Sequence, residues 1–338
     1  MRAYEIIPGT TVESIRLTER PAPVARAGQV LIDIRACALN FRDVINISGP
    51  QDGSPKVTGV VPLSDGAGVV TAVGEGVTRL KVGDRVAGAF MPDWLSGPMT
   101  PEVQAGALGG TVDGVLAEQI ALPATGAVKI PEHLSFVEAA TLPCAGVTAW
   151  YAQFVGGHIL PGETVLLLGT GGVSIFALQF AKMAGARVIL TSSSDEKLER
   201  ARALGADHVI NYRRQPEWQN TVLDLTDGRG ADHAVEVGGP DTLNKTLQAV
   251  RVGGSISLMG VLTGFTANLS TVSILHKNIK IQGTYVGSVA MFEAMNRAIA
   301  LHRMTPVIDR VFAFDEAVNA LKYLQSGNHF GKVVIARD

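Results

Sequence analysis

The sequence has few cysteines, no excess of charge of either sign and no long apolar run. Two cysteines among 338 residues are too few for a disulfide framework and suit a reducing cytoplasm. Lys and Arg number 29 against 31 Asp and Glu, so charge gives no reason to expect nucleic acid or a membrane as partner. No apolar run approaches a membrane span, and the start at Met1 is not a signal peptide. We expect a soluble, cytoplasmic protein of two domains.

A glycine-rich turn in the middle of the chain carries the strongest signal. Thr164–Leu168 is an uninterrupted apolar run typical of a buried parallel strand, and GTGGVS follows it directly, before a helical pattern and a second apolar run. Glycines there let the backbone approach a pyrophosphate at a helix N-terminus. Ser174 replaces the third glycine but is small enough for close packing. The pattern favours dinucleotide binding over a turn without ligand, with contacts at Gly169, Gly171, Gly172 and Val173.

Strands and helices continue to alternate after this turn. Further strands are predicted at 208–211, 232–237, 255–259 and 279–283. Six strands in this rhythm predict an α/β fold with a doubly wound parallel sheet, whose ligand crevice lies where the first and fourth strands end. The segments that follow the fourth and fifth strands should therefore border a cofactor, at Gly238, Gly260, Val261 and Leu262.

The first 128 residues have a different pattern, with short strands and turns rather than helices, typical of a small irregular β-barrel. Met91–Gly110 is a long excursion from it, either a lid lined by apolar side chains or a surface loop packed on itself. A helix at 315–324 and a strand at 331–336 follow the sheet and should return to the barrel. We therefore expect one domain at 1–130 and 306–338, and another at 131–305.

Several motifs together resemble a known superfamily. They are NFRDV at 40–44, GAGVV at 66–70, VGDRV at 82–86, LPCAGVTAW at 142–150, GTGGVS at 169–174 and HFGKVV at 329–334. The whole chain resembles the medium-chain dehydrogenases/reductases (MDR), and within them the zinc-independent quinone oxidoreductases and enoyl reductases, although many relatives are called alcohol dehydrogenases. The resemblance implies a GroES-like domain for the substrate, a Rossmann domain for NAD(P)H and an active site between them. It also implies a homodimer that pairs the sixth strands of two sheets.

The zinc ligands of the superfamily are where the sequence departs from its best-known members. Those members carry a cysteine at the position of Asn40, a His-Glu pair at Ser64–Asp65 and a second cysteine at Cys144. Only Cys144 remains a good ligand, and the excursion at 91–110 lacks the cysteines of the structural zinc lobe. The seven histidines are scattered, with no pair at ligand spacing. We expect no zinc, and Cys144 is interpreted as a buried thiol, with a reactive nucleophile as the alternative.

The resemblance also implies roles for individual residues. Asn40 matches a position that faces the nicotinamide, and is the best candidate to donate a hydrogen bond to the developing oxyanion. Asp43 either relays a proton or fixes the loop. Lys332 orients Asn40 or the cofactor ribose, or is an exposed lysine at a strand end. Thr148, within LPCAGVTAW, is expected at the cofactor.

The end of the second Rossmann strand bears on the choice of cofactor. NAD enzymes of this architecture place an acid there for the ribose 2′-OH, whereas this chain has Ser192–Ser193. Lys197 and Tyr212 match residues that hold the 2′-phosphate in the quinone reductase group, and Arg213–Arg214 add positive charge. Asp195–Glu196 lie nearby and argue against this unless they only support a helix start. We expect NADPH.

These observations predict an NADPH-dependent oxidoreductase that transfers hydride to a small carbonyl, α,β-unsaturated carbonyl or quinone without a catalytic metal. One alternative is an alcohol dehydrogenase acting on an alcohol and its aldehyde or ketone. A second alternative is a redox-sensing protein that binds NADPH without turnover. The glycine turn does not discriminate among them, because all three bind the cofactor.

Overall fold

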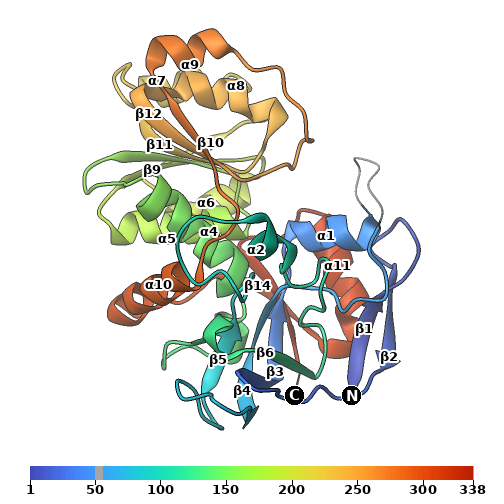
Figure 1. Cartoon of the computed structure of the whole chain (residues 1–338). Helices are drawn as coiled ribbons and strands as arrows, with labels where there is room; N and C mark the ends of the chain where they lie inside the picture. The colour runs from blue at the N-terminus through green and yellow to red at the C-terminus, as the bar shows by residue number, and fades with distance from the viewer. Residues whose placement is uncertain (50–55, 338) are drawn as a thin grey trace. The chain divides into compact units, whose positions relative to one another are not determined.

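The computed structural model describes residues 1–49 and 56–337, which form two compact units (Figure 1). The first unit comprises Met1–Val147 and Val286–Asp338, and the second comprises Thr148–Tyr285. Among the described residues, no helix has the length and apolar character needed to cross a membrane.

The second unit, described throughout, is built on one parallel sheet of six strands in the order β10-β9-β8-β11-β12-β13. This order confirms the predicted doubly wound sheet. The strands are β8 (Thr164–Leu168), β9 (Arg187–Ser192), β10 (His208–Asn211), β11 (Ala231–Glu236), β12 (Val250–Leu258) and β13 (Lys280–Gly283). The helices are α5 (Gly172–Met183), α6 (Asp195–Ala203), α7 (Trp218–Asp224), α8 (Pro240–Ala249) and α9 (Thr271–Lys277).

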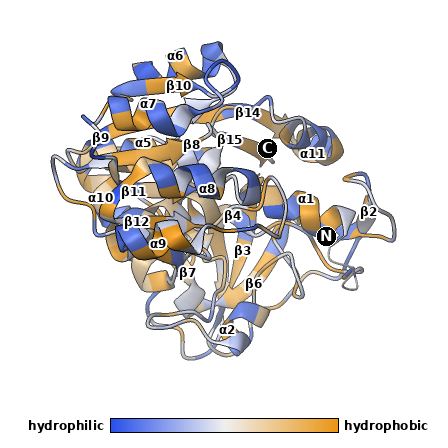
Figure 2. Ribbon diagram, turned by 90° about the horizontal axis from the view of Figure 1, so that it is seen from above, coloured by the Kyte–Doolittle hydropathy of each residue, from blue (hydrophilic) through white to orange (hydrophobic). Residues whose placement is uncertain are grey.

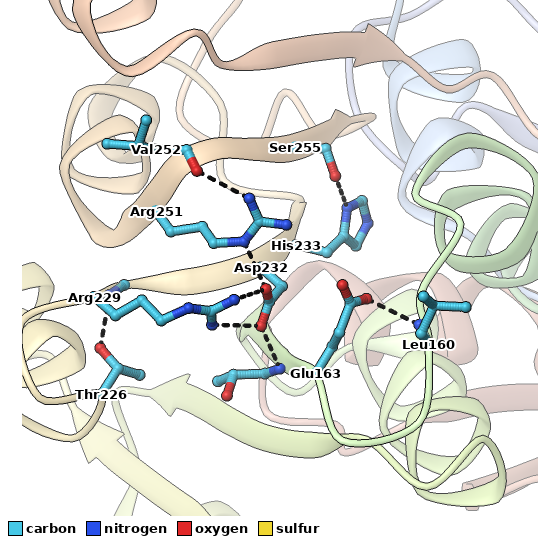
Figure 3. Close-up of polar contacts among 11 residues, drawn as sticks. Leu160, Glu163, Thr226, Arg229, Asp232, His233, Arg251, Val252 and Ser255 are labelled. Atoms are coloured by element: carbon cyan, nitrogen blue, oxygen red, sulfur yellow. Dashed lines mark hydrogen bonds and ion pairs between the residues drawn. The ribbon is translucent and has the colours of Figure 1, made fainter.

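Burial of the central strands explains why their pattern is readable. All five residues of β8 and all six of β11 are buried, so both strands are covered on both faces. A polar network adds to this core at the start of the strands (Figure 3). Asp232 of β11 accepts the backbone N–H of Thr164 at 2.8 Å and hydrogen bonds from Arg229 and Arg251. The network ties β8 to β11 at the end of the sheet opposite the glycine turn.

Among its described residues, the first unit contains a seven-stranded mixed sheet and a two-stranded one. The larger sheet runs β14-β15-β3-β4-β5-β7, with β6 also paired to β3. In Figure 2, β3 and β6 are mostly orange while α11 carries both colours, as expected for a sheet core covered by an amphipathic helix. The strands are β1 (Arg2–Ile6), β2 (Ile15–Glu19), β3 (Gln29–Ala38), β4 (Asp65–Val73), β5 (Arg85–Gly88), β6 (Gln119–Pro123), β7 (Ala127–Lys129), β14 (Ile308–Ala313) and β15 (Lys332–Ala336).

The helices of this unit correct part of the sequence prediction. Before residue 128 only strands and turns were expected, yet Phe41–Ser48 forms α1 and Pro101–Ala105 forms α2. The β-branched residues of α1 obscure its helical character, and burial of Val44 and Ile47 stabilises it. The remaining helices are α3 (Phe136–Ala139), α4 (Val147–Trp150, across the unit border), α10 (Val289–His302) and α11 (Ala317–Gln325). As predicted, α11 and β15 belong with the first unit.

The borders of the units differ from those expected at 130/131 and 305/306. Helix α10 belongs to the first unit because Asn296 donates to the carbonyl of Lys129 at 3.0 Å and Val289 N–H donates to the carbonyl of Trp94 at 2.8 Å. Trp94 and Met91 are themselves buried, and the Trp94 indole donates to Gly97 O at 2.9 Å. The segment around Met91 and Trp94 is therefore buried and bonded to α10, and the choice between a lid and a loop packed on its own side chains stays open.

Candidate active site

The turn from β3 into α1 places Asn40 at the start of the helix. Asn40 is extended, with φ −133° and ψ 154°, and its backbone N–H donates to Asp43 Oδ2 at 2.8 Å. The Asp43 N–H donates back to Asn40 O at 2.9 Å. These two bonds satisfy backbone groups at a helix start and fix the Asn40 backbone. Oδ2 of Asp43 therefore fixes the loop at Asn40, as one of the two interpretations of Asp43 expects.

Lys332 lies beside Asn40, although the two residues are far apart in the sequence. Its side chain is 3% exposed, and Nζ donates to Leu39 O at 2.7 Å and to Asn40 Oδ1 at 2.7 Å. Gly331, with φ 76°, precedes β15, and a Cβ added at this position would lie only 2.5 Å from Val307 O. The backbones therefore pack closely where the chain enters β15. Lys332 is thus not an exposed lysine at a strand end. It orients Asn40.

The Asn40 carboxamide is oriented by this contact. Its oxygen faces the ammonium, and its Nδ2 is buried without a hydrogen-bond partner among the described residues. The amide lies close enough to Asp65 to lower the pKa of that carboxyl, but outside hydrogen-bond geometry. A buried N–H donor that lacks a partner costs free energy, and such a group calls for an explanation.

Asp65 completes the polar cluster. It is fully buried, accepts Ser64 Oγ at 2.6 Å and the Cys144 N–H at 3.1 Å, and its Oδ2 lies 3.9 Å from Lys332 Nζ. Burial raises the pKa of Asp65, against the opposing effects of the Lys332 charge and the hydrogen bonds. The cluster joins three stretches named by the motifs, NFRDV, LPCAGVTAW and HFGKVV, with the residues just before GAGVV.

Asp43 differs from Asp65 in having one oxygen that no hydrogen bond satisfies in the described part of the chain. Burial raises the pKa of Asp43 to about 6, although Arg42, 3.6 Å from Oδ1, opposes the shift. Arg42 is itself occupied, donating to Leu108 O at 2.8 Å and lying over the Phe90 ring at 4.5 Å. An ionisable group poised near neutral pH in a buried site is a candidate for proton transfer.

The donor set of this cluster does not fit a tetrahedral zinc ion, which takes Cys, His or carboxylate ligands. The three ligand positions hold an amide, a Ser–Asp pair and one thiol, with a lysine ammonium among them. No group of three His, Cys, Asp or Glu residues suited to a metal occurs within the described ranges. Burial and the carboxyl groups nearby raise the pKa of the Cys144 thiol, which keeps it protonated and disfavours the nucleophile interpretation.

In the second unit, the glycine turn leads from β8 into α5 as the motif predicts. Gly169 has φ 74° and its N–H donates to Thr191 O at 2.8 Å, while Gly171 precedes the helix in an extended conformation. Ser174 is buried and its hydroxyl donates to Leu168 O at 2.6 Å. This bond explains why serine is tolerated where the motif has its third glycine. The first amides of α5, from Gly172 and Val173, lack acceptors within the helix and suit a phosphate.

The end of β9 brings together the residues predicted to choose the cofactor. Ser192 is buried, Ser193 is partly exposed, and Ser194 caps α6 by accepting the Lys197 N–H at 3.4 Å. Tyr212 donates its N–H to Ser192 O at 3.1 Å and keeps 41% of its surface exposed.

Asp195, the nearby acid that argued against NADPH, is engaged by other side chains. Its Oδ1 accepts Asn211 Nδ2 at 2.7 Å, and its Oδ2 is bonded to Arg214.

A buried acid that the sequence analysis did not identify shapes the turn after β11. Glu236 is fully buried, and its Oε1 accepts the N–H groups of Gly238 and Gly239 at 2.8 and 3.1 Å and Thr242 Oγ1 at 2.7 Å. Its Oε2 accepts Thr246 Oγ1 at 2.5 Å. The acid ends a buried strand and is separated from Gly238-Gly239-Pro240 by Val237 alone, a pattern that could have indicated a carboxylate anchoring a turn.

Packing accounts for glycine in the segment after β12. A Cβ on Gly260 would lie 1.7 Å from Val237 O, so the two strand ends touch through their backbones. Leu262 is 53% exposed and Val261 is partly exposed, whereas Thr148 is buried. Cofactor contacts at these four positions and at Gly238 stay predictions.

Comparison with known proteins agrees with this arrangement. Residues 26–132 match the alcohol dehydrogenase GroES-like domain, and residues 172–301 match the zinc-binding dehydrogenase domain. The zinc-type alcohol dehydrogenase-like protein C1773.06c of Schizosaccharomyces pombe is 46% identical over 317 residues, 92% of this chain and 91% of the relative. The crystal structure of an NAD-dependent alcohol dehydrogenase has a TM-score of 0.90 and 32% identity over 99% of both chains. A quinone oxidoreductase of Pseudomonas syringae pv. Tomato DC3000 has a TM-score of 0.84 and 27% identity over 99% of both. The chain therefore belongs to the medium-chain dehydrogenases/reductases and is an oxidoreductase of that superfamily.

Proposed function

We propose that the protein reduces a small carbonyl, α,β-unsaturated carbonyl or quinone with NADPH and without a catalytic metal. The observation that carries the proposal is the buried Asn40 amide, whose oxygen is bonded to Lys332 and whose nitrogen has no partner within the described residues. Such a nitrogen is an N–H donor suited to an oxygen that gains negative charge.

Bound NADPH would supply the hydride, and the residues of the chain would supply position and polarisation. Asn40 Nδ2 donates to the substrate oxygen, and Lys332 and the Asn40–Asp43 backbone bonds hold that donor in place. Burial of the cluster strengthens the donor, because electrostatic interactions are larger where water is excluded. The first amides of α5 hold the pyrophosphate.

The preference for NADPH is supported by the residues that follow β9. Ser192 stands where NAD enzymes carry an acid, and hydroxyls donate to a phosphate that a carboxylate would repel. Asp195 is engaged by Asn211 and Arg214, which reduces its effect on a bound anion. We further propose a homodimer paired through β13, which is an edge strand of the described sheet. We also propose that the protein works in the reducing cytoplasm, since both cysteines are free.

Alcohol oxidation is the second candidate, favoured by one observation. It needs a base for the hydroxyl proton, and the pKa of Asp43 near 6 would let its carboxylate serve as one. The redox-sensing alternative requires that NADPH binds without turnover, and it shares the same cofactor residues.

The test measures oxidation of NADPH and of NADH by the purified protein with quinones, enones, aldehydes and ketones, and the reverse reaction with alcohols. We expect reduction of at least one carbonyl class, a clear preference for NADPH, and activity that is unchanged by chelators and by added zinc. Asn40→Ala should lower kcat about a hundredfold while the Kd for NADPH stays unchanged. One tightly held zinc per chain that restores chelator-lost activity would contradict the metal-free mechanism, and binding without turnover would favour the sensor.

A further inference from the structure

We infer that Lys332, held by Asp65, is a fixed internal cation that dictates which face of the Asn40 carboxamide meets the substrate. The inference rests on the proposed function and deepens it, because it selects the class of oxygen that the site accepts. Lys332 and Asp65 are positioning residues in this account, and Asn40 is the residue that touches substrate.

The first step concerns the two ends of the amide. A carboxamide carries an acceptor oxygen and a donor nitrogen of nearly the same shape, so packing alone does not choose between its two orientations. An ammonium has only donors, and Lys332 Nζ lies 2.7 Å from the Asn40 side chain. Only the oxygen can face it. The nitrogen therefore faces away from the ammonium. It lies near the Asp65 carboxyl, whose pKa the amide lowers, but makes no hydrogen bond of ordinary geometry among the described residues.

The second step concerns the charge of Lys332. A buried ammonium needs a counter-charge, and the charge of Asp65 Oδ2 lies 3.9 Å away. At this distance the carboxylate offsets the charge of the ammonium but does not form a hydrogen bond with it. Asp65 therefore does not compete with Asn40 Oδ1 for the N–H donors of Lys332. Ser64 Oγ donates to Asp65 Oδ1 at 2.6 Å, and the Cys144 N–H donates at 3.1 Å to Oδ2, the oxygen that faces Lys332. These two bonds fix the carboxyl beside the lysine.

The third step concerns the substrate. A cation on the amide oxygen polarises the amide, which makes its N–H a stronger donor. The nitrogen donates and does not accept, so it favours a carbonyl or quinone oxygen over a hydroxyl that must lose a proton. Bound NADPH would supply the hydride to the substrate carbon and would itself be oxidised; the C=O π pair would move onto oxygen, where the Asn40 N–H would stabilise it, and the oxyanion would then take a proton from water.

The activity test uses the best carbonyl substrate of the wild-type protein with NADPH. We expect Lys332→Met to lower kcat about a hundredfold with KM changed by less than about threefold, and Asp65→Asn to lower kcat about tenfold. Lys332→Ala leaves a cavity that ethylammonium can fill, so ethylammonium should raise the kcat of this variant at least about tenfold. It should not change the kcat of Lys332→Met. Lys322→Ala, which removes an exposed lysine paired with Glu13, is the matched control and should behave as wild type.

A second measurement does not depend on turnover. Selective ¹⁵N-asparagine labelling gives a side-chain NH₂ signal for Asn40, assigned by its loss in Asn40→Asp. We expect Lys332→Ala to displace this signal and ethylammonium to return it, with the circular dichroism spectrum unchanged. An unmoved signal, or wild-type kcat in Lys332→Met, would overturn the inference. If the wild type reduced no carbonyl while the Asn40 signal still followed Lys332, the proposed function would fail but the orienting role would stand.

Discussion

Asp232 in the second unit and Asp43 in the first unit are both buried, and their surroundings shift the pKa values of the two carboxyl groups in opposite directions. Asp232 in the second unit accepts four hydrogen bonds, from Arg229 twice, from Arg251 and from the Thr164 backbone (Figure 3). Burial opposes its ionisation, yet these bonds hold the pKa of Asp232 at about 2. Asp43 in the first unit is as deeply buried, but one of its oxygens has no hydrogen bond within the described chain, and burial raises its pKa to about 6.

This difference shows two opposite ways of burying a carboxyl group. A carboxylate with four donors is fixed as an anion and contributes to stability, whereas one with an unsatisfied oxygen costs free energy when it ionises. The unsatisfied Asn40 Nδ2 lies in the same motif as Asp43, although other buried polar atoms of the described chain, such as Gln153 Oε1 and His233 Nε2, also lack a hydrogen-bond partner. The predictions below test this contrast by changing one carboxylate at a time.

The largest effect is expected from Asp232→Ala, which leaves the Thr164 N–H without its acceptor and two arginines without their counter-charge. We expect a loss of about 3 kcal/mol in the free energy of unfolding at pH 7, because breaking a buried charged network is costly even when one arginine is partly exposed. Because the folded pKa is depressed, the loss is full above pH 4 and shrinks as the pH falls toward 2. Urea unfolding measures it.

The exposed Asp224 is the control for this measurement, and Asp224→Ala should stay within about 0.5 kcal/mol of wild type. Equal losses for Asp232→Ala and Asp224→Ala would contradict the structural role of the network.

Asp43→Asn should act in the opposite direction. A carboxyl whose folded pKa is raised stabilises the fold below its unfolded pKa of 3.8 and loses that contribution as the pH rises to about 6. The asparagine keeps an oxygen for the Asn40 N–H but never ionises. The free energy of unfolding of the variant, relative to wild type, should therefore rise by about 2 kcal/mol between pH 4.5 and pH 7. The exposed Asp93→Asn change should show no such pH dependence. If the free energy of unfolding of Asp43→Asn differed from that of wild type by the same amount at every pH, Asp43 would not be ionising in this range.

Most of the fold could be predicted from the sequence because the buried parallel strands leave a strong pattern. The run Thr164–Leu168 is apolar throughout, and His208–Asn211 was assigned with the bounds that the structure has. Helix α1 was missed because its sequence is rich in β-branched residues and tertiary burial decides its conformation. Helix α10 packs on Trp94 and Lys129, contacts between distant segments that no local pattern reports.

The motifs named residues that the structure brings together, but not their contacts, and the catalytic roles of these residues stay predictions. Asn40, Asp43 and Lys332 were named from motifs, and the structure brings all three together with Asp65. The sequence left Lys332 with several interpretations because its burial depends on β15 pairing with β3, almost 300 residues away in the sequence. Glu236 was missed because two of its four partners are backbone N–H groups, which have no sequence signature, and the other two are threonine hydroxyls on the helix that follows the turn.

The smallest effect is expected at Asp195, a third kind of carboxylate that is exposed and paired. Its side chain is 49% exposed, and Asn211 and Arg214 occupy both oxygens. Exposed ion pairs contribute about 0.2–1 kcal/mol, so Asp195→Asn should raise the preference for NADPH over NADH by no more than about fivefold, through loss of a negative charge. Lys197→Ala should instead reduce that preference about tenfold, because it removes a charge-assisted bond to the 2′-phosphate. The ratio of kcat/KM values for the two cofactors measures both variants. A collapse of NADH use in Asp195→Asn would mean that Asp195 receives the ribose 2′-OH, and the cofactor assignment would then reverse.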